Sequence, residues 1–176
     1  MKNGLVHIYT GDGKGKTTAS IGLGMRALGR GFKVLMVQFL KGNETGEMFS
    51  LKKHEPDFFF YSGIAEKKFT WEMNEGELES CKANQNKNFE FAKKELESGK
   101  WDMVILDEIL AAVNAGMIDL NQLKQLVEER PKHIELIITG RDAPPELIEL
   151  ADYVSEIKEI KHPMTKGVKP RQGIED

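Results

Sequence analysis

The sequence is poor in cysteine and has no long hydrophobic run. Its one cysteine, Cys81, excludes an internal disulfide and a cysteine-built zinc ribbon. The apolar runs, such as 58–61 and 103–106, are far shorter than the roughly 18 residues of a membrane-spanning helix. The N-terminus lacks the apolar core of a signal peptide, so we expect a cytoplasmic protein that is not exported and has no membrane partner.

An excess of basic residues is also missing. The 176 residues contain 25 Lys and Arg against 28 Asp and Glu, which gives a formal net charge of −3. A surface without a basic excess argues against a nucleic-acid partner. Hydrophobic residues make up 40% and charged residues 30%, a balance typical of globular proteins rather than disordered ones. We therefore expect one globular domain over residues 1–176.

Apolar runs typical of strands alternate along the chain with segments of helical composition. The predicted strands cover 5–10, 33–39, 58–61, 101–106, 134–139 and 153–157, and the predicted helices cover 16–30, 75–98, 120–129 and 144–151. This alternation predicts an α/β fold with a mostly parallel sheet flanked by helices. Two remaining stretches, 41–47 and 63–75, are long enough to be predicted binding loops.

A glycine-rich segment, TGDGKGKTT at 10–18, separates the first predicted strand from the first predicted helix. It ends as a Walker A motif does, although Thr10 stands where the first glycine normally lies. In such a loop, backbone N–H groups and the helix N-terminus bind phosphate, Lys16 reaches a terminal phosphate, and Thr17 binds Mg²⁺. The candidate nucleotide-binding residues are Gly11, Asp12, Gly13, Lys14, Gly15, Lys16, Thr17 and Thr18.

A second candidate element is the apolar run 103–106, which is followed by two carboxylates, Asp107 and Glu108. This is the form of a Walker B element, in which a carboxylate at the end of a strand holds Mg²⁺ directly or through water. The plainer alternative is a strand that ends in two solvated acids. Taken alone, the Walker A and Walker B segments would fit an ATPase.

The full set of motifs resembles the P-loop-type cob(I)alamin (corrinoid) adenosyltransferases over nearly the whole chain. The matching segments are 10–18, VQFLKG at 37–42, FTWE at 69–72, LDE at 106–108, ITGR at 138–141, AD at 151–152, KHP at 161–163 and GIE at 173–175. A P-loop alone is common to many activities, whereas this ordered combination is specific. The resemblance implies a single-domain, RecA-like P-loop NTPase fold.

The resemblance also implies a reaction. The family transfers the 5′-deoxyadenosyl group of ATP to the cobalt(I) of a corrinoid and releases triphosphate, with the nucleotide reversed in its P-loop. Lys16 and Mg²⁺ would neutralise the leaving group, and Glu108 would be a Mg²⁺ ligand together with Thr17 and Asp107. Phe69 and Trp71 would pack on the lower corrin face and displace the axial ligand, which eases reduction of cobalt(II).

Further expectations rest on the same resemblance. Arg141 and His162 are candidate contacts of the nucleotide or the corrinoid, and the expected partners are ATP, a corrinoid, a flavoprotein-type reductant and a second copy of the chain. Two departures from the family pattern are visible. Asp12 replaces a usual asparagine and puts a negative charge near the polyphosphate, and we expect the N-terminal helical extension of longer relatives to be missing.

Three alternatives remain. A P-loop small-molecule kinase or ATPase would release ADP or phosphate, and an ATP-gated corrinoid-binding module would bind both ligands without turnover. A nucleic-acid motor is disfavoured by the net charge. For Phe69 and Trp71, the alternative role is that of core residues. Analysis of the reaction products separates these functions.

Overall fold

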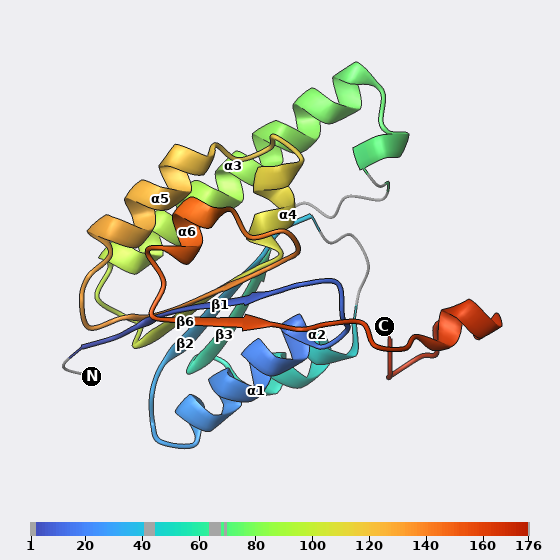
Figure 1. Cartoon of the computed structure of the whole chain (residues 1–176). Coiled ribbons are helices and arrows are strands. Elements are labelled where there is room, and N and C mark those ends of the chain that lie inside the picture. The colour runs from blue at the N-terminus through green and yellow to red at the C-terminus, as the bar shows by residue number, and fades with distance from the viewer. Residues whose placement is uncertain (1–2, 41–44, 64–67, 69, 176) are drawn as a thin grey trace.

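The computed structural model describes residues 3–40, 45–63, 68 and 70–175. Within them, six parallel strands form one sheet in the order β3-β2-β4-β5-β1-β6 (Figure 1). The strands are β1 (Val6–Thr10), β2 (Val34–Gln38), β3 (Phe58–Ser62), β4 (Met103–Asp107), β5 (Glu135–Thr139) and β6 (Tyr153–Glu156). The helices are α1 (Lys16–Leu28), α2 (Gly46–Leu51), α3 (Glu75–Glu97), α4 (Ile109–Asn114), α5 (Leu120–Glu129) and α6 (Pro145–Ile148), with 3₁₀ turns η1 (Lys52–His54), η2 (Thr70–Glu72) and η3 (Pro163–Lys166).

The helices cover both faces of the sheet, as the sequence predicts. Figure 1 shows α1 and α2 on one face and α3 to α6 on the other. The reason is the right-handedness of parallel crossovers. The chain runs from β1 to β2 and β3 in one direction, and then back through β4 and β5 to β6, so its helices change face after β3. The predicted α/β fold is confirmed, with a sheet that is parallel throughout.

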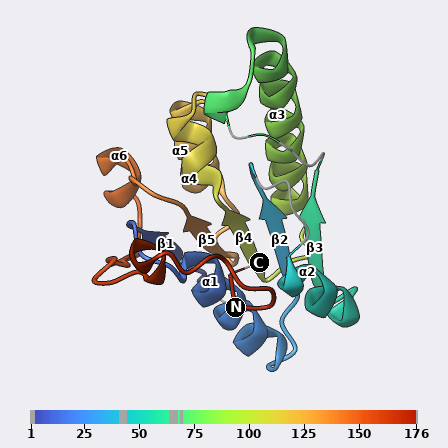
Figure 2. The same cartoon turned by 90° about the vertical axis from the view of Figure 1, so that its right-hand side faces the viewer.

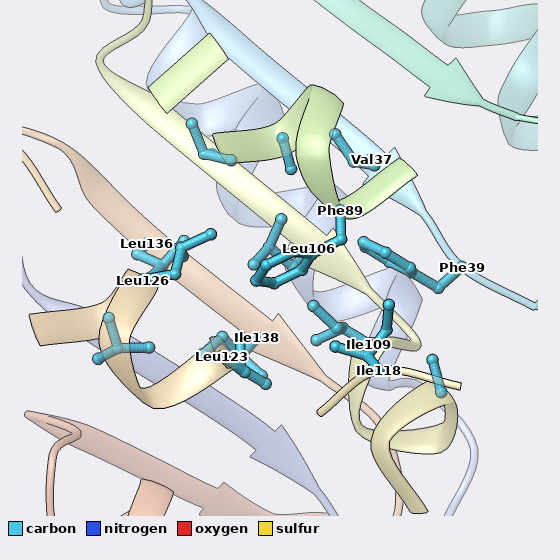
Figure 3. Close-up of a cluster of buried hydrophobic side chains, with 14 of the residues drawn as sticks. Val37, Phe39, Phe89, Leu106, Ile109, Ile118, Leu123, Leu126, Leu136 and Ile138 are labelled. Atoms are coloured by element: carbon cyan, nitrogen blue, oxygen red, sulfur yellow. The ribbon is translucent and has the colours of Figure 1, made fainter. Parts of the chain in front are cut away.

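The two core clusters follow from the alternation of side chains along the central strands. All five residues of β2 and of β4 are buried, as expected for strands covered on both faces. In β4, Val104 and Leu106 belong to the larger cluster. Figure 3 shows Leu106 in this cluster with Phe89 of α3 and Leu123 of α5. Met103 and Ile105 belong to the smaller cluster on the α1 face.

Helix α1 approaches the sheet closely because its buried stripe is made of small residues after the first turn. The buried positions are Lys16, Ser20, Gly24 and Ala27. A Cβ added at Gly24 would lie 2.7 Å from Cε1 of Phe58, so a larger residue there would push α1 away from the sheet. The close contact fixes the N-terminal turn of α1, and with it Lys16, at the carboxyl edge of the sheet.

Several element boundaries differ from the prediction. Helices α2 and α4 were not predicted, because six residues are too few to show a helical period. Helix α1 ends at Leu28 rather than at residue 30, and α6 has four residues rather than eight. Strand β4 begins at Met103, because Trp101 instead stacks on Phe59 before the strand.

The two predicted binding loops contain short helical segments where they are described. The end of the 41–47 stretch is the first turn of α2, and the 63–75 stretch contains η2. Residues 41–44, 64–67 and 69 lie outside the described residues. In the described part of the chain, we find no helix with the length and hydrophobicity needed to cross a lipid bilayer.

Candidate functional site

The glycine-rich loop connects β1 to α1 at the carboxyl edge of the sheet, where parallel α/β sheets bind ligands. Gly11 has φ 98° and Gly15 has φ 121°, a backbone conformation that glycine adopts without strain. Residues 12–18 line a cavity of about 490 Å³, here called the P-loop cavity. The predicted phosphate-binding residues 12–18 are therefore brought together around one cavity, whereas Gly11 precedes them in the loop and is not part of the lining.

Two of these glycines also have a structural function that the sequence analysis missed. The Gly13 N–H donates a hydrogen bond of 2.7 Å to the carbonyl oxygen of Ile157, just after β6. A Cβ added at Gly11 would lie 2.5 Å from the same oxygen. The absence of side chains at Gly11 and Gly13 thus allows the chain leaving β6 to pack directly on the loop, and the Gly13 amide is used within the protein.

Lys16 is buried at the base of the loop, with 7% of its surface exposed. Its Nζ donates hydrogen bonds to the carbonyl oxygens of Gly11, at 2.6 Å, and Gly13, at 3.0 Å. Burial lowers the pKa of Lys16, and the nearby Glu108 carboxylate opposes that shift. Lys16 thus contributes a buried cation to a cavity that Lys14 and Arg141 also line.

The two carboxylates at the end of β4 lie in different surroundings. Asp107 is fully buried: its Oδ2 accepts a hydrogen bond from Gln38 Nε2 at 3.0 Å, and its Oδ1 accepts one from Thr139 Oγ1 at 2.8 Å. The Glu108 N–H donates to the same Thr139 hydroxyl at 2.9 Å. Glu108 has φ 59°, and it lines the P-loop cavity, whereas Asp107 lies outside the lining.

This hydrogen-bonded group joins the carboxyl ends of three neighbouring strands, β2, β4 and β5. It holds Glu108 in a left-handed conformation that is uncommon for residues other than glycine. Sequence reasoning missed Gln38 and Thr139 as site residues, although both lie in segments that carry the family resemblance. Their polar side chains at the ends of buried strands were the available signal.

The donor atoms of the P-loop cavity suit a hard divalent cation. Thr17 contributes a hydroxyl and Glu108 a carboxylate to its lining, and Mg²⁺ in nucleotide sites is commonly held by one or two such oxygens together with phosphate and water. The described residues contain no cluster of three or more His, Cys, Asp or Glu that could hold a metal ion by itself. The residues present therefore fit Mg²⁺ bound jointly with a phosphate ligand.

The segment after β6, residues 157–175, forms part of the wall of the P-loop cavity, although it lies at the opposite end of the chain from the loop. We call it the C-terminal segment; Figure 2 views the molecule from the side on which it lies. His162, Gly173, Ile174 and Glu175 line the cavity, so the KHP and GIE segments meet the P-loop in space. His162 also accepts a hydrogen bond from the Met164 N–H at its Nδ1, 3.3 Å away.

A charge cluster attaches this segment to the loop. Lys14 Nζ donates to the carbonyl oxygen of Ile174, at 2.7 Å, and to Glu175 Oε1, at 3.3 Å. The Arg171 guanidinium donates to both oxygens of the Glu175 carboxylate, at 3.2 and 3.1 Å. Hydrogen bonds from Arg171, and then from Lys14, lower the pKa of Glu175 to about 2.

A second cavity, of about 600 Å³, adjoins the first and is here called the Trp71 cavity. Its lining residues are Phe39, Leu40, Lys68, Thr70, Trp71, Glu108, Ala111, Asn114, Ala115, Arg141 and Asp142. Glu108 and Arg141 line both cavities. Trp71 is 77% exposed, so the alternative role of a core residue is wrong for Trp71; Phe69 lies outside the described residues.

Known proteins similar to this chain agree with the motifs. The family described as ATP:corrinoid adenosyltransferase BtuR/CobO/CobP matches residues 2–175. A corrinoid adenosyltransferase from Escherichia coli K12 is 37% identical over 175 residues, which cover 99% of this chain and 86% of the relative. A corrinoid adenosyltransferase from a Sinorhizobium species is 38% identical over 176 residues, covering 99% and 81%.

Among solved structures, the flagellar accessory protein FlaH from Methanocaldococcus jannaschii has a similar fold. The TM-score is 0.54 at 16% sequence identity, over 89% of this chain and 72% of FlaH. At that identity the similarity concerns the fold alone. With the P-loop between β1 and α1, it agrees with the predicted P-loop NTPase-like, RecA-like architecture.

Proposed function

This chain belongs to the ATP:corrinoid adenosyltransferase family, and we propose that its two adjoining cavities hold the two substrates of that reaction. The enzyme adenosylates a corrinoid with ATP. In the proposal, the P-loop cavity binds the phosphates and the Trp71 cavity binds the corrinoid. The observation that supports this proposal is that Glu108 and Arg141 line both cavities, so that the two substrates would meet beside these residues.

The proposed chemistry requires no protein nucleophile. Cobalt(I) donates an electron pair to C5′ of the ribose, the bond between C5′ and the phosphate oxygen breaks, and its electron pair leaves with triphosphate. The protein must therefore bind and neutralise the leaving group and align it with cobalt. This alignment requires C5′ to face the Trp71 cavity, and we propose the reversed nucleotide orientation of the family for that reason.

Lys16 and the loop are the groups proposed to receive the triphosphate. Lys16 is already surrounded by carbonyl oxygens at the base of the cavity, so its ammonium group is oriented before phosphate arrives. Backbone N–H groups around the start of α1 add partial positive charge there. Arg141 and His162 line the same cavity and are proposed as further nucleotide contacts.

Thr17 and Glu108 would hold Mg²⁺, whose charge would offset the negative charge of the phosphates. Of the two carboxylates at the end of β4, Glu108 is the proposed ligand because it lines the cavity. Asp107 is buried with both oxygens hydrogen-bonded, so we propose that it acts on the site through Thr139 and the backbone of Glu108.

On the corrinoid side, Trp71 is proposed to pack on the lower corrin face together with Phe69. Trp71 is exposed within a cavity that Phe39, Leu40, Ala111 and Ala115 make partly apolar. An apolar contact that excludes axial water would favour the reduction of bound cobalt(II). We also propose, from the family resemblance, a cytoplasmic homodimer that receives electrons from a flavoprotein-type reductant.

Product analysis tests the function. With Mg²⁺, ATP and chemically reduced cob(I)alamin, we expect equimolar adenosylcobalamin and triphosphate. ADP or phosphate in place of triphosphate would instead support the kinase or ATPase alternative. Tight binding of both ligands with no product would support the ATP-gated binding module.

A further inference from the structure

Leu40 has an unusual backbone conformation in the wall of the Trp71 cavity. It follows β2 by two residues, lines the cavity beside Phe39, and has φ 51°. The left-handed region is uncommon for a residue as bulky as leucine, and such conformations persist where the surroundings enforce them. The neighbouring Phe39 N–H is fixed by a hydrogen bond of 2.9 Å to the Asp107 carbonyl oxygen.

The side chain that holds Leu40 comes from α3. Gln85 is 1% exposed, and its Oε1 accepts a hydrogen bond of 3.1 Å from the Leu40 N–H. A buried amide is costly unless it is hydrogen-bonded, so an apolar side chain would fill this position at lower cost if packing were its only function. Neither Gln85 nor Leu40 lines the P-loop cavity.

Helix α3 is connected to two parts of the Trp71 cavity wall, by the hydrogen bond from Leu40 to Gln85 and by the short stretch of chain between Trp71 and the N-terminus of the helix. Three residues before its Asn74 cap lies Trp71, and the cap is closed by reciprocal hydrogen bonds of 3.0 Å between Asn74 and Glu77. Asn88, one turn after Gln85, packs on Gly63 so closely that a Cβ there would overlap its amide. Helix α3 therefore contacts the chain just after β2, at Leu40, and just after β3, at Gly63. It begins a few residues after Trp71.

Resting on the proposed function, we propose that Gln85 is a positioning residue for the corrinoid. By accepting the Leu40 N–H, it keeps the Leu40 side chain in the wall of the corrinoid cavity, at a fixed place relative to Trp71. Its effect is therefore confined to one substrate. Loss of the acceptor would let Leu40 relax toward a common backbone conformation and move its side chain out of the wall.

Gln85→Leu tests this inference, because it removes the acceptor at similar volume. The measurements are equilibrium titrations with cob(II)alamin and, separately, with MgATP, followed by steady-state kinetics. We expect the corrinoid Kd and KM to rise about fivefold, the loss typical of one hydrogen bond. The ATP Kd and kcat at saturating corrinoid should stay within about twofold. Gln125→Leu is the matched control, since Gln125 is exposed on α5 and lines neither cavity.

A double-mutant cycle tests whether Gln85 acts through Leu40. Glycine tolerates φ 51° without help, so Leu40→Gly should weaken corrinoid binding by removing the side chain alone. Adding Gln85→Leu to it should cost little more, giving a strongly non-additive cycle. Additive losses would mean that Gln85 does not act through Leu40, and would overturn the inference.

Other outcomes separate this inference from the proposed function. A folded Gln85→Leu variant with unchanged corrinoid affinity, or with equal losses for ATP and corrinoid, overturns the positioning role. If Gln85→Leu fails to fold, the milder Gln85→Asn, which withdraws the acceptor by one methylene, must show the same selective loss. A wild-type protein that binds no cob(II)alamin would overturn the proposed function instead.

Discussion

Lys14 of the P-loop donates a hydrogen bond from Nζ to the carbonyl oxygen of Ile174, 160 residues further along the chain. The same ammonium group lies 3.3 Å from the Glu175 carboxylate, which Arg171 also binds. The loop and the C-terminal segment therefore form the P-loop cavity together. A phosphate ligand that displaces Lys14 from this contact would loosen the segment, and one that leaves the contact intact would be enclosed by it.

The hydrogen bonds of Glu175 with Lys14 and Arg171 are predicted to hold the C-terminal segment against the P-loop. Glu175→Gln removes the charge that binds Lys14 and Arg171, so we expect faster tryptic cleavage within residues 158–171. The free energy of unfolding should change little, because exposed ion pairs contribute little to it. Glu79→Gln, at an exposed glutamate of α3 outside the C-terminal segment, is the control. Equal cleavage rates for wild type and Glu175→Gln would contradict the attachment.

The same carboxylate predicts a pH dependence. Its pKa is about 2 in the folded protein, below the ordinary value of 4.5. The depressed pKa means that the folded state favours the ionised form, so the attachment is complete above pH 4.5 and is lost as the pH falls toward 2. An NMR titration of the Glu175 carboxyl carbon should have its midpoint near 2. A midpoint near 4.5 would show a carboxylate free of Arg171 and Lys14.

Lys16→Ala should abolish adenosyl transfer by weakening the binding of triphosphate. Lys16 supplies a buried cation at the base of the P-loop cavity, and charge-assisted contacts to phosphate are strong. Calorimetry with MgATP should show an affinity lower by at least about tenfold. Lys93→Ala, an exposed lysine of α3, serves as the control. Wild-type ATP affinity in a folded Lys16→Ala protein would refute the P-loop assignment.

Thr139→Val tests the group that holds Glu108. Valine keeps the shape and removes the hydroxyl shared by Asp107 and the Glu108 N–H, so we expect the free energy of unfolding to fall by about 1–3 kcal/mol. Activity should fall as well, with a higher Mg²⁺ requirement. Thr139→Ser keeps the hydroxyl and should retain most of both. Glu108→Gln should lose activity alone; if its activity is unchanged, Glu108 is not the Mg²⁺ ligand.

Trp71→Ala should impair the reduction-linked step more than the alkyl transfer. Trp71 is 77% exposed, so its removal should leave the free energy of unfolding within about 0.5 kcal/mol of wild type. With cob(II)alamin and a biological reductant, most activity should disappear, whereas chemically generated cob(I)alamin should restore much of it. Phe69→Ala is expected to behave in the same way. Electron paramagnetic resonance of cobalt(II) with MgATP should show a four-coordinate signal that both variants reduce.

Two results would contradict this last prediction. Equal losses with cobalt(II) and with cobalt(I) would mean that the aromatic residues only position the substrate. Absence of a four-coordinate signal in the wild-type protein would mean that the lower axial ligand is not displaced.

Much of the architecture can be predicted from local sequence patterns. The glycines and lysines at 11–16 predict the phosphate loop, because its backbone conformation depends on residues that are adjacent in the chain. The strand-like runs predict all six strands, and the central strands β2 and β4 are apolar because both of their faces are buried. Strand β6 is exposed along its length, so its prediction rests on the alternation of strands and helices in the chain. The short helices α2 and α4 were missed, since their formation depends on tertiary packing more than on their own composition.

The tertiary structure alone decided which distant groups meet at the site. The strand order puts β5 between β1 and β4, and this brings the Thr139 hydroxyl to both Asp107 and the Glu108 amide. In the same way, the chain leaving β6 meets Gly13, and Gln85 meets the Leu40 amide. None of these pairs has a local period or spacing, because each contact depends on the order of strands in the sheet and the faces that the crossovers select. The sequence by itself determined the chemistry available at the carboxyl edge, and the packing of the strands and helices decided how it is oriented.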